Sequence, residues 1–129
     1  MSLLIFIVVI GILILVHELG HFFSALLLKI KVEEFAIGFG PAIFKYIYKD
    51  IKFRLNLFPL GGYVKIYGQE NDQKGKDSYS QRPVWQRLLV IIAGVFMNFV
   101  FASLLFFILL ASKGFVDRFD YSILDTQTQ

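Results

Sequence analysis

The residues best suited to chemistry in this chain are two histidines and a glutamate in the run His17–Glu18–Leu19–Gly20–His21. Four residues of a helix rotate by about 400°, so both imidazoles lie on one helix face, one turn apart. This spacing predicts that His17 and His21 bind one Zn²⁺. Glu18 would then lie close enough to take a proton from a metal-bound water without binding the metal itself. The alternative is two incidental polar residues on a soluble helix, since so short a pattern also arises by chance.

The surroundings of this histidine cluster (residues 17–21) favour the metal interpretation. Apolar residues dominate 3–28 and again 88–111, and each run exceeds the ~20 residues that a helix needs to cross a bilayer. Fourteen apolar residues precede His17, a rise of about 21 Å along a helix. The cluster is therefore expected inside the cytoplasmic part of the bilayer, where ionisable side chains are costly and are functional by default.

Composition excludes several other classes of protein. The chain is 57% hydrophobic, above the usual fraction for a soluble domain of 129 residues. It has no cysteine, which rules out disulfides and thiolate ligands, and its net charge of +3 does not indicate nucleic acid as a partner. The first apolar run is too long, and lacks the basic flank, for a secretory signal.

The distribution of basic residues predicts the orientation. Eleven of the thirteen lysines and arginines lie between the two apolar runs, and none precedes the first. The positive-inside rule then places residues 29–87 in the cytoplasm and both termini outside, in a multi-pass protein of the cytoplasmic membrane. Trp85 suits an interfacial anchor before the second helix.

The connecting segment is predicted to contain a β-hairpin. Residues 53–57 alternate apolar and polar, Pro59–Leu60–Gly61–Gly62 breaks the chain, and residues 63–67 suggest a second strand. Leu55 and Leu57 could help to present a strand edge on which an unwound substrate pairs. These residues leave open whether the hairpin dips into the membrane or packs on its surface. A second turn is expected at 38–41 and a polar loop at 69–81.

Asn98 is a further polar residue inside the second apolar run, at a depth similar to that of the histidine cluster. Its amide could hydrogen-bond a substrate carbonyl or a developing oxyanion. An interhelical hydrogen bond, common in membrane bundles, is the alternative and is the preferred interpretation from the residues alone.

Together these residues resemble the site-2 protease family, in particular its bacterial regulator-of-sigma-E protease branch. The resemblance covers roughly residues 1–112, and the shared stretches occur in the family's order and spacing. They are His-Glu-Leu-Gly-His at 17–21, Phe-Ala-Ile-Gly-Phe-Gly-Pro at 35–41, Pro-Leu-Gly-Gly-Tyr-Val-Lys at 59–65, Arg-Pro-Val-Trp-Gln-Arg at 82–87 and Ala-Gly-Val-Phe-Met-Asn at 93–98.

The resemblance implies a zinc-dependent intramembrane protease that cuts transmembrane segments, such as those of anti-sigma factors, signal-peptide remnants or membrane-bound transcription factors. It implies a mainly α-helical membrane protein of two transmembrane helices joined by a cytoplasmic segment with a membrane-reentrant β-hairpin over about 32–68. It also implies that Gly94 and Asn98 form a substrate-contacting motif, although Val95 stands where the family usually has proline.

The family's third zinc ligand, an aspartate of a later helix, is not expected in this chain. Asp117, Asp120 and Asp125 lie in the segment 113–129, which the topology places outside the membrane on the far side. We therefore expect the chain to form half of a site, completed by a missing C-terminal half, and to be inactive alone. The alternatives are a catalytically inactive scaffold that retains the hairpin, or a zinc-binding segment for transport or sensing.

Overall fold

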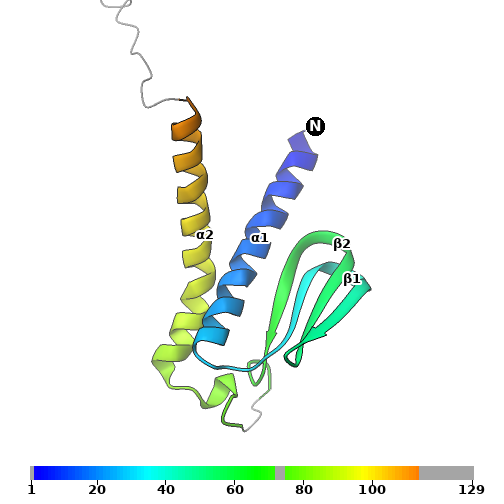
Figure 1. The fold of residues 1–129 in the computed structure, drawn as a ribbon, viewed down its shortest axis with the longest axis vertical. Coiled ribbons are helices and arrows are strands. Elements are labelled where there is room, and N and C mark those ends of the chain that lie inside the picture. Colours follow the sequence, from blue (N-terminus) through cyan, green and yellow to red (C-terminus); the bar gives the residue numbers. More distant parts are fainter. Residues whose placement is uncertain (1, 72–74, 114–129) are drawn as a thin grey trace, which may run out of the picture.

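The computed structural model describes residues 2–71 and 75–113. Helix α1 (Ser2–Leu27) is followed by strands β1 (Val32–Tyr48) and β2 (Ile51–Ile66), a short 3₁₀ helix η1 (Tyr79–Gln81) and helix α2 (Val84–Lys113). Helix α1 lies between α2 on one side and the sheet on the other (Figure 1). The order of elements agrees with two apolar helices joined by a β segment.

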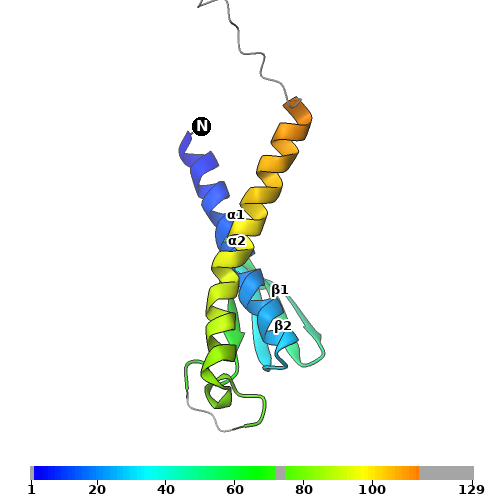
Figure 2. The same ribbon diagram turned by 90° about the vertical axis from the view of Figure 1, so that its left-hand side faces the viewer.

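Both helices are long and apolar enough to cross a membrane, as judged from length and composition. The apolar part covers 25 residues of α1 and 29 residues of α2. The observed bounds lie close to the expected 3–28 and extend the expected 88–111 at both ends, so that Trp85 belongs to the first turn of α2. The two helices cross where Gly20 of α1 meets Ala93 and Gly94 of α2, and they diverge toward the N-terminus of α1 (Figure 2).

The β-hairpin differs from the predicted one. Strands β1 and β2 join through Lys49 and Asp50, whose φ angles of 48° and 63° form a tight turn, and Tyr48 pairs with Ile51. The predicted pairing of 53–57 with 63–67 is therefore wrong. The stretch Pro59–Gly62 lies within β2 rather than in a hairpin turn.

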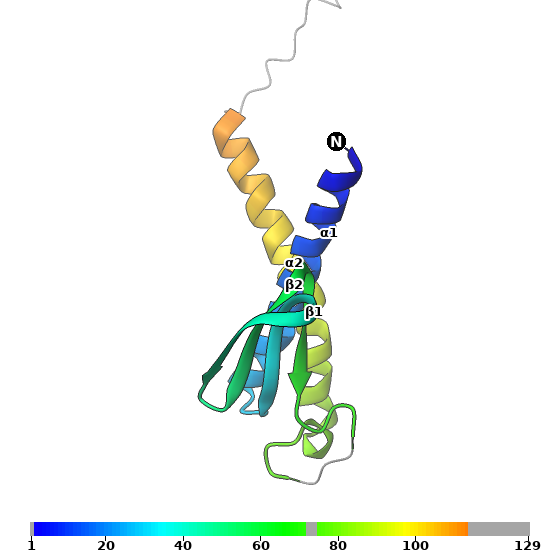
Figure 3. The same cartoon turned by 90° about the vertical axis from the view of Figure 1, so that its right-hand side faces the viewer.

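Each strand instead bends back on itself, which turns two strands into four adjacent rows. The bends lie at 38–41 in β1 and 58–61 in β2, and Gly38, Gly40 and Gly61 adopt positive φ there. The register gives the order of the rows across the sheet as 44–48, 51–55, 34–37 and 62–65. Both bends lie at the same end of the sheet, beside the middle of α1 (Figures 1 and 3).

The two faces of the sheet are chemically different because side chains alternate along each row. Phe35 and Phe53 pack against Phe22 of α1, with ring centroids 5.0 and 6.0 Å away from that of Phe22. Glu34 and Arg54 project from the opposite face. The core lies where the apolar face meets the last turns of α1. Its buried residues are Phe22, Ala25, Ile30, Val32, Phe35, Ala36, Ile51, Ile66 and Val90.

The last row of the sheet runs alongside α1. A Cβ built on Gly11 of α1 would lie 3.2 Å from the nitrogen of Gly61, and one on Gly62 would lie 3.4 Å from Leu15. Further along, the Val64 nitrogen is 3.1 Å from the Glu18 carboxylate. The row at 61–64 therefore follows α1 from its middle to the histidine cluster.

The crossing of the two helices depends on Gly20. A Cβ at this position would lie 2.3 Å from the carbonyl oxygen of Ala93 and 2.9 Å from the Cα of Gly94, both backbone atoms of α2. Backbone cannot move aside as a flexible side chain can, so only glycine allows this approach.

We expect Gly20→Ala to weaken the packing of α1 on α2 by about 1–3 kcal/mol, the usual cost of overpacking. Alanine has a higher helix propensity than glycine, so helix propensity alone would make Gly20→Ala more stable. A loss of stability would therefore report the clash with α2. Thermal unfolding of the purified chain in detergent measures the effect. The control is Ile12→Ala, a change at an exposed position of the same helix. Unchanged or higher stability of Gly20→Ala would contradict the close crossing.

Candidate metal and catalytic site

The two histidines lie next to each other on α1. Their ring centroids are 4.7 Å apart, and the rings are nearly perpendicular at 83°. Two imidazoles that bind one Zn²⁺ through bonds of about 2.0–2.1 Å have centroids on the order of 5 Å apart. The spacing of His17 and His21 thus suits a shared metal ion.

A main-chain carbonyl of α2 orients His21. The Nδ1 atom of His21 lies 2.7 Å from the oxygen of Val90. A carbonyl oxygen only accepts hydrogen bonds, so Nδ1 must carry the proton and donate it. In the neutral ring Nε2 then keeps its lone pair, which is the form of histidine that binds a metal, and the hydrogen bond at the other nitrogen holds the ring in place.

His17 lies directly against Gly94 of α2. A Cβ built on Gly94 would be 2.6 Å from both Cε1 and Nε2 of the His17 ring. Gly94, expected to contact substrate, is thus buried beneath a predicted metal ligand.

The sheet reaches the predicted base, Glu18. The main-chain N–H of Val64 donates a hydrogen bond of 3.1 Å to Oε2 of Glu18. Val64 belongs to the row of β2 nearest α1, so the bond joins the two elements at the site. A charge-assisted bond of this kind orients the carboxylate.

The other predicted site residues lie further away or have different surroundings. Asn98 lies on α2 one turn beyond Gly94, and its buried Oδ1 has no hydrogen-bond partner among the described residues. The expected interhelical bond to this oxygen is therefore not formed within that part of the chain. Leu55 and Leu57 are half-exposed, but Leu55 pairs with both Phe44 and Ile37. The backbone at Leu55 is thus inside the sheet rather than at the strand edge predicted for it.

A polar network lies on the face of the sheet turned away from α1. Arg54 Nη1 donates to Glu34 Oε1 at 2.9 Å, and the Tyr63 hydroxyl donates to the same oxygen. Burial opposes ionisation of Glu34, but the hydrogen bonds from Tyr63 and Arg54 outweigh it and hold the pKa of Glu34 below its ordinary value. Burial, together with the Glu34 carboxylate, raises the pKa of Tyr63.

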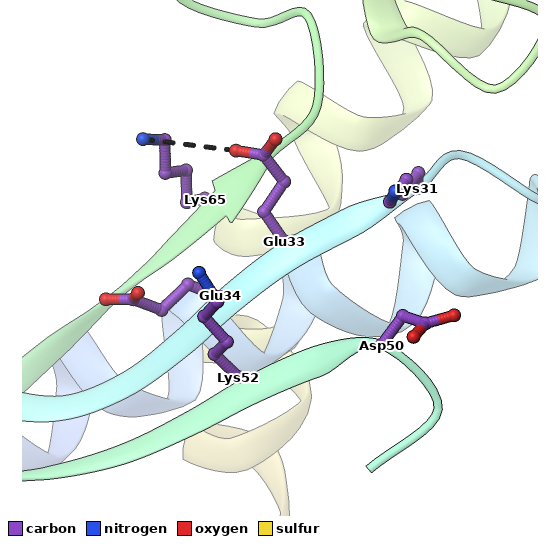
Figure 4. Close-up of a pocket in the computed structure, with 6 residues that line it drawn as sticks. All are labelled: Lys31, Glu33, Glu34, Asp50, Lys52 and Lys65. Carbon is purple, nitrogen blue, oxygen red and sulfur yellow. Dashed lines mark ion pairs between the residues drawn. The ribbon is translucent and has the colours of Figure 1, made fainter. Parts of the chain in front are cut away.

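A charged cleft opens at the end of the sheet opposite the bends. Its volume is about 350 Å³, and Lys65 and Glu33 form an ion pair of 3.9 Å at its rim (Figure 4). No residue of the histidine cluster lines it. The lining residues are Lys31, Glu33, Glu34, Asp50, Lys52 and Lys65.

Comparison with known proteins identifies the family. Residues 5–128 match the model of peptidase family M50. The chain belongs to this family. The match covers nearly the whole sequence and confirms the resemblance drawn from the five sequence stretches.

Three curated relatives are named as candidate zinc metalloproteases. The chain is 42% identical over 117 residues to one from Fusobacterium nucleatum, covering 91% of the chain and 34% of the relative. It is 44% identical over 106 residues to one from Thermotoga maritima, covering 78% and 21%, and 45% identical over 106 residues to one from Clostridium perfringens, covering 82% and 32%. The chain thus spans about a third or less of the length of these relatives.

The donor atoms found in this M50 chain suit zinc, but they make up only part of a zinc ligand set. His17 and His21 have suitable spacing, and His21 has its Nε2 free for a metal. Within residues 2–71 and 75–113, no group of three or more His, Cys, Asp or Glu side chains is placed to hold a metal ion. Asp117, Asp120 and Asp125 lie outside the described residues.

Sequence reasoning missed two groups of the site, the Val90 carbonyl and the Val64 amide. Both belong to the main chain, and valine at these positions carries no side-chain signal for polar chemistry. Only the packing of α2 and β2 against α1 brings these groups to His21 and Glu18.

We expect the Val64 amide to be protected from hydrogen exchange by Glu18. Glu18→Ala removes the acceptor and should speed exchange at Val64 by roughly ten-fold or more, since hydrogen bonds to charged groups contribute about 1.5–3 kcal/mol. Glu18→Gln keeps a side-chain oxygen and should retain part of the protection. NMR exchange measurements on the chain in detergent test this, with the Tyr46 amide of an outer row as the internal control. Equal exchange at Val64 in the wild type and Glu18→Ala would exclude the hydrogen bond.

Proposed function

We propose that this chain provides the base and two zinc ligands of an intramembrane metalloprotease that cuts transmembrane segments of regulatory membrane proteins. The observation that carries the proposal is the His17–Glu18–His21 cluster inside an apolar helix, with His21 and Glu18 each oriented by a main-chain group of a neighbouring element. The relatives' zinc metalloprotease names and the M50 match support the same chemistry.

In this proposal the two histidines bind the metal and Glu18 transfers the proton. His17 and His21 would hold the metal through ring nitrogens, and a third ligand would come from another segment, as the resemblance implies. Zinc held there would supply a Lewis acid for the activation of water. Glu18 takes the water's proton and passes it to the leaving amine, and the Val64 amide keeps its carboxylate in place.

The sheet is proposed to enter the membrane from the cytoplasm. Its bend at Gly61 contacts Gly11, sixteen residues from the end of α1, which is about 24 Å along a helix. If α1 spans the bilayer, the bend then lies at membrane depth. Exposed apolar side chains surround both bends and suit lipid or an apolar substrate; they are Phe39, Leu57, Phe58 and Leu60.

The charged face of the same sheet requires water or protein next to it. Glu34 and Arg54 cannot face lipid without large cost, so this face is proposed to lie against water or another protein segment. The charged cleft, at the end of the sheet away from the bends, is proposed to open to the cytoplasm.

Substrate contacts are proposed at Asn98, Leu55 and Leu57. The amide oxygen of Asn98 is buried without a partner among the described residues and could be satisfied by a substrate N–H. Leu55 and Leu57 would contribute through their half-exposed side chains rather than through a backbone edge.

Role separation within the cluster tests the chemistry. The Fusobacterium nucleatum relative, with its matching segment replaced by this chain, provides a protein of full length. There Glu18→Gln should keep zinc and lower cleavage of a transmembrane substrate in liposomes by roughly 10²–10⁴-fold, because only the base is lost. His17→Ala and His21→Ala should lose zinc as well, as metal analysis would show. Equal zinc loss in all three variants would assign Glu18 a structural role.

Topology is tested separately with introduced cysteines, since the chain has none of its own. Lys76→Cys should react with an impermeant thiol reagent only after the cytoplasmic side is opened, and Ser122→Cys should react in intact cells. The expectation rests on the eleven-to-two distribution of basic residues. Labelling of Lys76→Cys in intact cells would overturn the orientation.

A further inference from the structure

The surroundings of Gly94 point to a role other than substrate contact. The three atoms nearest to a Cβ built there all belong to the His17 ring: Cε1 at 2.6 Å, Nε2 at 2.6 Å and Cδ2 at 2.8 Å. A real Cβ essentially never comes within 3.0 Å of another heavy atom, so any other residue would force the ring to move. We infer that Gly94 is a positioning residue that seats the imidazole of His17 for metal binding.

The His17 ring has little freedom to move away. Helix α1 is held against α2 at Gly20, whose would-be Cβ meets backbone of Ala93. The ring of His21 lies 4.7 Å from that of His17 and is itself tied to the Val90 carbonyl. Metal sites tolerate deviations of only about 0.2 Å in ligand distance, so even a small displacement of Nε2 weakens binding.

The atoms that a Cβ would meet at Gly20 and at Gly94 distinguish ligand positioning from simple helix packing. A side chain at Gly20 would collide with the backbone of α2, which is what a helix-crossing glycine does. The atoms nearest to a side chain at Gly94 are those of one imidazole ring. A side chain at Gly20 would therefore obstruct backbone, whereas one at Gly94, whose own Cα lies in the same crossing, would obstruct the ligand ring.

This inference rests on the proposed zinc site, and the composition of the chain makes it measurable. His17 and His21 are its only histidines, so ¹⁵N-labelled histidine gives signals from two rings. Gly94→Ala should shift the His17 ring signals, leave the Nδ1-protonated form of His21 in place and weaken zinc binding by roughly ten-fold or more, as for other changes that disturb ligand orientation. Val95→Ala, the exposed neighbour on α2, is the control and should change neither.

A double-variant cycle separates ligand positioning from helix packing. Gly94→Ala should lower the thermal midpoint of the wild-type chain in detergent but have little effect in a His17→Ala background, where the obstructing ring is gone. An equal drop in both backgrounds would make Gly94 a helix-packing residue and overturn the inference. Unchanged zinc affinity and unchanged His17 signals in Gly94→Ala would overturn it as well.

Failure of the proposed function gives a different result. A wild-type chain that binds no zinc at millimolar concentration, even with a segment that supplies the third ligand, would contradict the zinc site. The ring shift and the double-variant cycle would still report whether Gly94 seats His17.

Discussion

The central physical constraint on this fold is the cost of placing two imidazoles and a carboxylate in a helix that is otherwise apolar. Polar groups without water must find hydrogen-bond partners inside the protein. Here main-chain groups of neighbouring elements serve as partners. The Val90 carbonyl accepts from His21 and the Val64 amide donates to Glu18. Both elements must therefore approach α1 closely, and the rest of the architecture follows from that need.

Close approach is obtained by glycine on both sides of α1. Gly20 allows the backbone of α2 to come near, and Gly11 and Gly61 allow the same for the last row of the sheet. Glycine destabilises the interiors of helices and strands. Its presence there indicates that the close approach of neighbouring elements matters more for this fold than helix or strand propensity. The benefit is that rigid main-chain groups, rather than flexible side chains, orient the chemical groups of the site.

The folding of two strands into four rows separates lipid-compatible surfaces from charged ones. One face of the sheet packs Phe35 and Phe53 on α1, and the other carries the Glu34–Arg54–Tyr63 network. An element with such faces can enter an apolar phase only with its charged side covered by water or protein. This arrangement brings one edge of the sheet to Glu18 while the charged face remains on the side away from α1.

The sequence by itself determined the family, the two apolar helices and the pairing of His17 with His21. The family follows from short sequence stretches and the helices from the length of the apolar runs. The histidine pairing follows from helix geometry, since 3.6 residues per turn places i and i+4 on one face whatever surrounds them. The hairpin was mispredicted because Pro59–Gly62 has the strongest turn signal, while the actual turn at Lys49–Asp50 has no glycine. Strand pairing depends on contacts between distant rows, which no local pattern reports.

Tertiary structure alone decided which atoms orient the site. Every residue except proline carries a carbonyl and an N–H, so no residue type marks Val90 or Val64 as a partner. The same holds for Gly94, whose significance depends on the imidazole that lies on it rather than on its own chemistry. Side-chain chemistry is encoded residue by residue, whereas main-chain chemistry acquires a role only when the chain has folded.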